Sequence, residues 1–105
     1  MAYEEALAER IRELIAGERG VTEKKMFGGL AFLVDGNMAI AASGQGGLLV
    51  RVDPDESEEL VRTTGAEVAV MRGRPMAGWL RAEAGDDLKD WVERGVAYAR
   101  SLRPK

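Results

Sequence analysis

Two arginines separated by a single glycine are the residues of this chain best suited to binding chemistry. Arg72 and Arg74 flank Gly73 and are followed by Pro75, a composition typical of the turn of a β-hairpin. Two guanidinium groups at such a tip can bind a phosphate or a carboxylate bidentately, and the proline stiffens the backbone that presents them. The alternative is a solvated turn whose arginines pair with nearby acids. Both interpretations stay open on the sequence alone.

Further side chains can extend this surface across one face of a sheet. They are Lys24, Lys25, Arg51, Arg81 and the aromatic Trp79. A domain that binds nucleic acid directly usually has a basic excess, whereas the net charge here is −3. We therefore expect contact with nucleic acid to be indirect or weak. Trp79 alternates with Leu80, so we expect it to cover the second face of the sheet or an interface.

The composition argues against catalysis and against bound metals. There is no cysteine and no histidine, which excludes thiolate nucleophiles, the commonest general base and the commonest metal ligand. The acids Asp53, Asp55 and Glu56 could hold a divalent cation, but a helix start around Pro54 uses them more simply as capping groups. We predict a protein that is not an enzyme and has no cofactor and no metal site.

Three glycine-containing segments are interpreted as turns. Gly28-Gly29 could approach a phosphate closely, but a strand follows it where a phosphate-binding loop needs a helix. A bend between two strands explains the pair better. Asp35-Gly36 predicts a two-residue hairpin turn, and the segment 43–47 predicts a plain connecting loop.

The elements that position these residues follow from periodicity. Apolar residues at the helical period predict a first helix over 3–16 that buries Leu14 in its stripe, and a last helix over 87–102. A further helix is expected between Asp53 and Gly65. Alternation and turn residues predict strands over 21–26, 29–34, 37–42, 48–52, 68–71 and 76–82, with 72–75 as the second hairpin turn.

This order predicts an α+β fold with two layers, in which an antiparallel sheet of five to six strands has its helices on one side. The order is α-β(3–4)-α-β(2)-α, within a single domain over residues 1–105. Small apolar residues on the second face of the sheet predict a homodimer that covers them: Ala31, Leu33, Ala39 and Ala41. Met38, Ile40 and Ala42 are expected to point to the helix side.

The cellular location is predicted from the lack of a signal peptide and of a membrane-spanning segment in the sequence. The first residues are acidic, and the longest uninterrupted apolar run covers only residues 30–34. We therefore expect a cytoplasmic protein that has no contact with a membrane.

A series of residues spread over the chain resembles the N-terminal domain of the TfoX/Sxy family. The series is Met26-Phe27-Gly28-Gly29, Phe32, Met38, Met71-Arg72-Gly73-Arg74-Pro75-Met76, Gly78-Trp79, Leu88, Trp91, Val92 and Tyr98-Ala99-Arg100. The resemblance implies an α+β domain with an antiparallel sheet, and it implies no catalytic residues. Full-length relatives regulate natural competence, assisting the cyclic-AMP receptor protein at certain promoters. This chain ends at Lys105 without their C-terminal helical domain, so we expect a stand-alone N-terminal domain.

Three hypotheses for function follow. The first is a regulatory or adaptor domain that binds a protein partner, at a transcription complex, through the turn at Arg72 and Arg74. The second is direct nucleic-acid binding through the basic side chains named above. The third is a small-molecule site, or an enzyme of unknown reaction, on the open face of the sheet beside Trp79.

Overall fold

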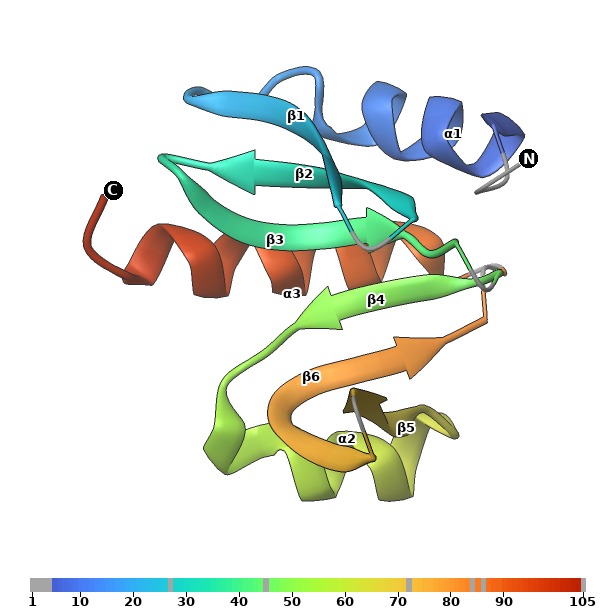
Figure 1. Ribbon diagram of the computed structural model, residues 1–105. Helices are drawn as coiled ribbons and strands as arrows, with labels where there is room; N and C mark the ends of the chain where they lie inside the picture. Colours follow the sequence, from blue (N-terminus) through green and yellow to red (C-terminus); the bar gives the residue numbers. More distant parts are fainter. Residues whose placement is uncertain are drawn as a thin grey trace.

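The protein folds into one six-stranded sheet with helices on one of its faces (Figure 1). The structure is a computed structural model that describes residues 5–26, 28–44, 46–71, 73–83, 85 and 87–104. The elements are α1 (Glu5–Ile15), β1 (Val21–Met26), β2 (Gly29–Val34), β3 (Asn37–Ala42), β4 (Leu48–Arg51), the 3₁₀ helix η1 (Pro54–Glu56), α2 (Ser57–Thr64), β5 (Glu67–Met71), β6 (Arg74–Ala82) and α3 (Leu88–Ser101). This order confirms the predicted α+β fold class.

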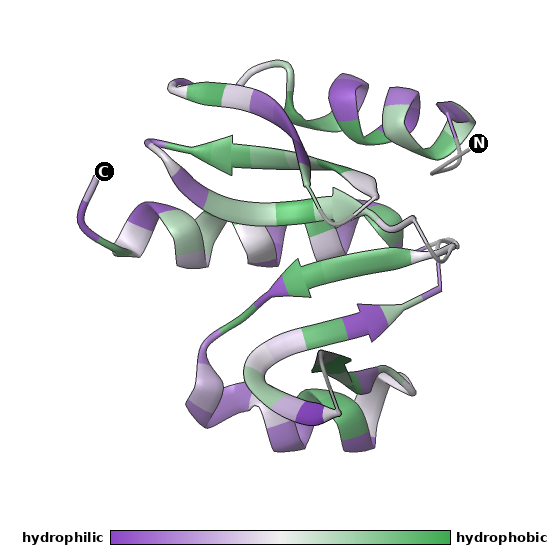
Figure 2. Cartoon of the chain, viewed as in Figure 1, coloured by the Kyte–Doolittle hydropathy of each residue, from purple (hydrophilic) through white to green (hydrophobic). Residues whose placement is uncertain are grey.

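The strands lie in the order β1-β2-β3-β4-β6-β5, and every neighbouring pair is antiparallel. Apolar residues run along β2, β3 and β4 in the middle of the sheet, whereas the centre of the edge strand β1 is hydrophilic (Figure 2). Charged side chains on an edge strand discourage pairing with another chain. The sequence of each strand thus matches its place in the sheet.

The main core lies between the sheet and the three helices. Its largest fully buried side chains include Trp91 and Leu88 from α3, Phe32 from β2 and Ile11 from α1. One prediction for α1 was wrong: Leu14 is not buried in the stripe but is 41% exposed. The buried stripe of α1 consists of Leu7, Ala8, Ile11 and Ile15. Leu14 flanks that stripe and borders a groove described below.

A β-bulge in β3 changes which residues face the helices. Phe32 pairs with Ile40 while Leu33 pairs with Met38, so Ala39 is an extra residue in β3. Ala39 therefore packs in the main core and Met38 packs on the second face, the reverse of the alternation expected from the sequence. Ile40 and Ala42 point to the helix side as predicted, and Ala41 lies on the second face.

The second face of the sheet holds a smaller apolar cluster. It contains Ala31, Met38, Ala41, Leu49 and Ala69, with Met26, Leu33 and Trp79 packed against it. Ala31 is 1% exposed and Ala41 6%, so these small residues are already covered within the single chain. They no longer supply a reason for dimerisation, and the homodimer stays a prediction.

The hairpin turns follow the local sequence. Gly28 stands between β1 and β2 with φ 76°, and Asp35 and Gly36 join β2 to β3 with φ 53° and 85°. Two successive positive φ values are those of the tight primed turn. The second hairpin is tighter than expected, because Arg74 already pairs with Met71 as the first residue of β6. Gly73, at φ 76°, lets the chain reverse before that pair.

Helix α3 is held close to the sheet at two points. A side-chain carbon on Gly95 would overlap the carbonyl oxygen of Ala39, which accounts for a glycine in the middle of a helix. At the other point the buried Asn37 donates through Nδ2 to the carbonyl oxygen of Arg103, at 2.8 Å. That bond satisfies a carbonyl just beyond the end of α3 and fixes the helix to the β2–β3 hairpin.

Candidate functional site

The sheet order separates the two lysines from the described arginines that the sequence grouped with them. Lys24 pairs with Ala31, on the second face, whereas Lys25 pairs with Leu30, on the helix side. Both stand on β1, with β2 and β3 between them and the β4 residue Arg51. Each strand adds about 5 Å across a sheet. The lysines therefore do not share a patch with Arg51.

The remaining basic residues also have separate surroundings. Arg81 donates to Ser43 Oγ at 3.5 Å and to the carbonyl oxygen of Gly46 at 3.2 Å, so it ties β6 to the loop before β4. Arg74 is exposed at the start of β6. Arg72, the other half of the predicted binding turn, lies outside the described residues.

The structure does bring Arg51 and Trp79 together. They are directly opposed in the β4–β6 pair, and the Arg51 guanidinium carbon lies 5.2 Å from the centroid of the Trp79 ring. A third residue joins them: the Tyr98 ring of α3 lies 5.6 Å from the same carbon. Both distances lie within the range of cation–π attraction. We call Arg51, Trp79 and Tyr98 the arginine–aromatic cluster.

Local strand pairing explains how a helix residue reaches this arginine. On the β3 side, β4 is paired only from Leu48 to Val50, so Arg51 lies just beyond the last β3 partner. On the other side Arg51 still pairs with β6. Helix α3 packs across β3 and β4, behind them in Figure 1. Tyr98 can therefore approach Arg51 where the two strands separate.

The arginine–aromatic cluster has no acid of its own. Among the described residues no carboxylate or carbonyl group forms an ion pair or a hydrogen bond with Arg51, although its side chain is partly buried. In the described side chains, every fully buried nitrogen or oxygen has a hydrogen-bond partner. Since the guanidinium nitrogens of Arg51 have none, they must be accessible to solvent. The N–H groups of Arg51 are therefore available to a ligand.

A cleft of about 270 Å³ adjoins the cluster, between η1 and α3. It is lined by Val52, Asp53, Glu56, Arg94, Ala97 and Tyr98. Asp53 also caps η1, accepting a hydrogen bond from the backbone N–H of Asp55 at 2.9 Å. Arg94 lies over the Trp91 ring at 5.0 Å and forms no ion pair with either acid within the described structure. Opposite charges thus line this cleft without neutralising one another. We call it the charged cleft.

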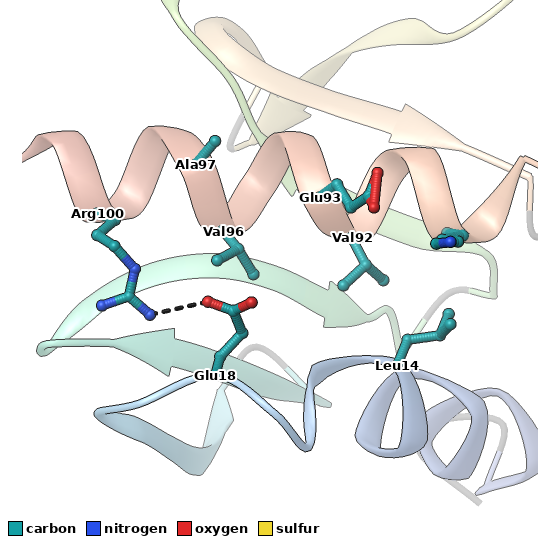
Figure 3. A pocket seen from close by; sticks show the side chains of 8 residues that line it. Leu14, Glu18, Val92, Glu93, Val96, Ala97 and Arg100 are labelled. Carbon is teal, nitrogen blue, oxygen red and sulfur yellow. Dashed lines mark hydrogen bonds and ion pairs between the residues drawn. The ribbon is translucent and has the colours of Figure 1, made fainter.

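A second hollow, of about 320 Å³, lies on the other flank of α3, against α1 (Figure 3). Its apolar lining consists of Leu14, Val92, Val96 and Ala97, and its charged rim of Glu18, Lys89, Glu93 and Arg100. Arg100 donates to Glu18 Oε1 at 3.0 Å and to the Arg19 carbonyl oxygen at 3.0 Å, closing one end. We call this hollow the helix groove.

On its outer side α1 is fixed to the sheet by an ion pair. Arg12 Nε donates to Glu23 Oε2 at 2.6 Å, and Arg12 also pairs with Glu9. The hydrogen bond from Arg12 lowers the pKa of Glu23. This pair joins α1, the helix that carries Leu14, to the edge strand β1.

No group of three or more acids is arranged for a metal ion in the part of the chain that the structure describes. None of its described helices has the length and apolar character needed to cross a membrane. Ser57 is buried and accepts a hydrogen bond from the Gly78 backbone N–H at 3.1 Å.

The family follows from the sequence comparison. A model of the TfoX N-terminal domain matches residues 13–99, which is most of the 105-residue chain. The chain belongs to this family. TfoX N-terminal domains are not known as enzymes, and the membership supports a regulatory or adaptor type of domain. No curated protein and no solved structure matches the chain.

The matched segment contains the arginine–aromatic cluster and most of both hollows. Sequence reasoning selected Arg51 and Trp79 but missed Tyr98, Arg94 and Leu14. Tyr98 follows Arg94 by four residues, which places both on one face of α3. That spacing was a usable signal, although nothing in the sequence says that this face meets the end of β4.

Proposed function

We propose that this TfoX N-terminal domain is a non-enzymatic regulatory adaptor that binds a protein partner, with the helix groove as its docking surface. The observation that carries the proposal is the exposure of Leu14. The side chains of the α1 stripe around it are almost fully buried, yet Leu14 turns 41% of its surface to solvent beside Val92 and Val96. An apolar side chain at the edge of an apolar hollow is typical of a binding surface.

The shape of the groove favours a helix as its occupant. Two packed helices form its walls, and a third helix fits such a channel by placing its apolar ridge between them. The rim carries two acids and two bases, so an amphipathic helix with mixed charges can satisfy it. The resemblance to competence regulators makes components of a transcription complex the first partners to test.

Affinity capture with three matched variants tests the proposal. Leu14→Glu places a charge in the helix groove. Val70→Glu is the control, because it places the same charge at another exposed apolar residue, which lies on β5 and is 61% exposed. Arg74→Glu reverses the charge at the hairpin tip. We expect Leu14→Glu alone to lose the captured partner. Loss with Arg74→Glu instead would assign docking to the turn, and unchanged capture by Leu14→Glu would exclude the helix groove.

A further inference from the structure

Arg51 carries a charge that the rest of the described chain leaves uncompensated. A partly buried guanidinium normally donates to a carboxylate or a carbonyl group, as Arg12 and Arg100 do here. Within the described residues the guanidinium of Arg51 has two aromatic rings as its neighbours and no acid or carbonyl partner. Attraction to the ring faces restricts the guanidinium without using any of its N–H groups. The result is a positioned cation whose hydrogen-bond donors are unoccupied.

The geometry of a guanidinium selects acceptors that present two oxygens side by side. Its N–H groups form a flat fork that matches two oxygens of a carboxylate or of a phosphate. The charged cleft separates these two possibilities. Asp53 and Glu56 line it, and their negative charges repel a phosphate dianion more strongly than a carboxylate with one charge.

We propose that the arginine–aromatic cluster is a recognition site for a carboxylate group. Arg51 binds the carboxylate, Trp79 and Tyr98 hold Arg51 in place, and the charged cleft accommodates the rest of the molecule. Arg94, on the same face of α3 as Tyr98, adds a second positive charge to the cleft. The carboxylate comes either from a small organic acid or from a peptide. The site lies on the opposite flank of α3 from Leu14 and does not depend on docking in the helix groove.

The two tryptophans provide a direct measurement on the whole protein. In a proton–nitrogen NMR spectrum the indole N–H of Trp79 reports on the cluster. The indole N–H of Trp91 reports on the folded core in each ligand-free variant, since that residue is buried and donates to Asp87 Oδ2 at 3.1 Å. The probes are acetate, a short neutral peptide with a free C-terminal carboxylate, the same peptide as its amide, and inorganic phosphate, all at constant ionic strength.

We expect the peptide acid to shift the Trp79 signal in a saturable way, while its amide leaves the signal unchanged and phosphate binds more weakly. Acetate that binds as tightly as the peptide acid identifies a small organic acid as the source. A peptide acid that binds at least about tenfold more tightly identifies a peptide. Equal shifts with acid and amide, or no saturable shift with any carboxylate, would overturn the proposal.

Two arginine variants separate recognition from general charge. Arg51→Lys keeps the charge but loses the planar fork, and we expect its affinity for the carboxylate to fall by about tenfold or more. Arg62→Lys, at an exposed arginine of α2, is the matched control and should bind like the wild type. An unchanged Trp91 signal verifies that each variant is folded. If Arg51→Lys binds as well as Arg62→Lys, Arg51 is not the recognising group.

Leu14→Glu in the same titration keeps the two proposals apart. The carboxylate shift should persist in this variant, because Leu14 lines the helix groove and is not among the residues that line the charged cleft. Loss of partner capture with retained carboxylate binding supports both proposals. Loss of carboxylate binding in Leu14→Glu would contradict the independence of the two sites.

Discussion

The two hollows beside α3 share a wall and differ in what they leave unsatisfied. Ala97 lines both. In the helix groove the Arg100–Glu18 pair closes one end, and apolar side chains lie between the charged residues of the rim. In the charged cleft the acids and Arg94 do not reach one another, and the neighbouring Arg51 has aromatic contacts in place of an acid.

This difference indicates two modes of recognition on one helix. An apolar hollow whose rim carries equal numbers of acids and bases selects mainly by shape and by the apolar area that it buries. A cleft with uncompensated charges selects by the sign and geometry of the group presented to it. In the two proposals the same 14-residue helix carries both sites, because its buried stripe leaves a flank on each side.

The largest expected effect is a difference in unfolding free energy between substitutions at two leucines of α1. Leu7→Ala removes a side chain that is 4% exposed and should lower the free energy of unfolding by about 2–5 kcal/mol. Leu14→Ala, beside the buried stripe of α1, should lower the free energy of unfolding by about 1 kcal/mol or less, since Leu14 is already partly exposed to solvent in the folded state. Urea denaturation of both variants measures the difference. Equal losses would mean that the helix groove is closed in solution.

An intermediate loss of stability is expected from a substitution that moves α3, the helix between the two hollows. Gly95→Ala places a methyl group against the Ala39 carbonyl oxygen, so α3 must move away from the sheet. We expect a net loss of about 1–3 kcal/mol in unfolding free energy, even though alanine favours a helix more than glycine does. Gly17→Ala is the control, because a side chain there meets no atom within 4 Å and its φ is not positive.

The same variant tests whether the two hollows depend on one helix position. If Gly95→Ala displaces α3, the Trp79 indole signal should shift and partner capture should weaken together. A change confined to one of them would show that each hollow is shaped mainly by its other wall.

The smallest effect concerns the ion pair between α1 and β1 and depends on pH. The hydrogen bond from Arg12 lowers the pKa of Glu23 below its ordinary 4.5, so the pair stabilises the fold fully above that pH. The contribution is lost as the pH falls through the lowered pKa. Both side chains are more than a third exposed, and solvent screening limits the effect to under about 1 kcal/mol.

Unfolding of Glu23→Gln and wild type at several pH values measures this term. The two proteins should differ at neutral pH and converge well below pH 4.5. Glu58→Gln, on α2 and without an ion pair in the described residues, should match the wild type throughout. A difference between Glu23→Gln and wild type that persists in strong acid would show that its origin is not the ion pair.

Most of the fold could be predicted because local signals agree with one another. The hairpin turn at Asp35-Gly36, the charged edge strand β1 and the glycine in the stripe of α3 each have one simple physical explanation. The order of the six elements follows from those signals. The bulge at Ala39 could not be predicted, because a single extra residue leaves the composition and alternation of the strand looking regular.

The site was only partly accessible from the sequence. Arg51 and Trp79 could be selected by residue type, but their pairing depends on β6 lying next to β4, a contact between distant segments. Tyr98 joins them only through tertiary packing, because α3 lies against the strands. The six basic residues proposed as one surface were grouped by charge, and sheet order separates Lys24 and Lys25 on β1 from the described arginines on the paired strands β4 and β6.

The extra residue at Ala39 has a practical consequence for anyone who compares or edits this strand. Along β3, positions 38 and 40 belong to opposite sides of the sheet, although they are two apart and would normally match. A polar substitution at position 40 disrupts the core under the helices, whereas one at position 38 disrupts the smaller cluster on the second face. Counting every second residue across this bulge therefore assigns half of the strand to the wrong side.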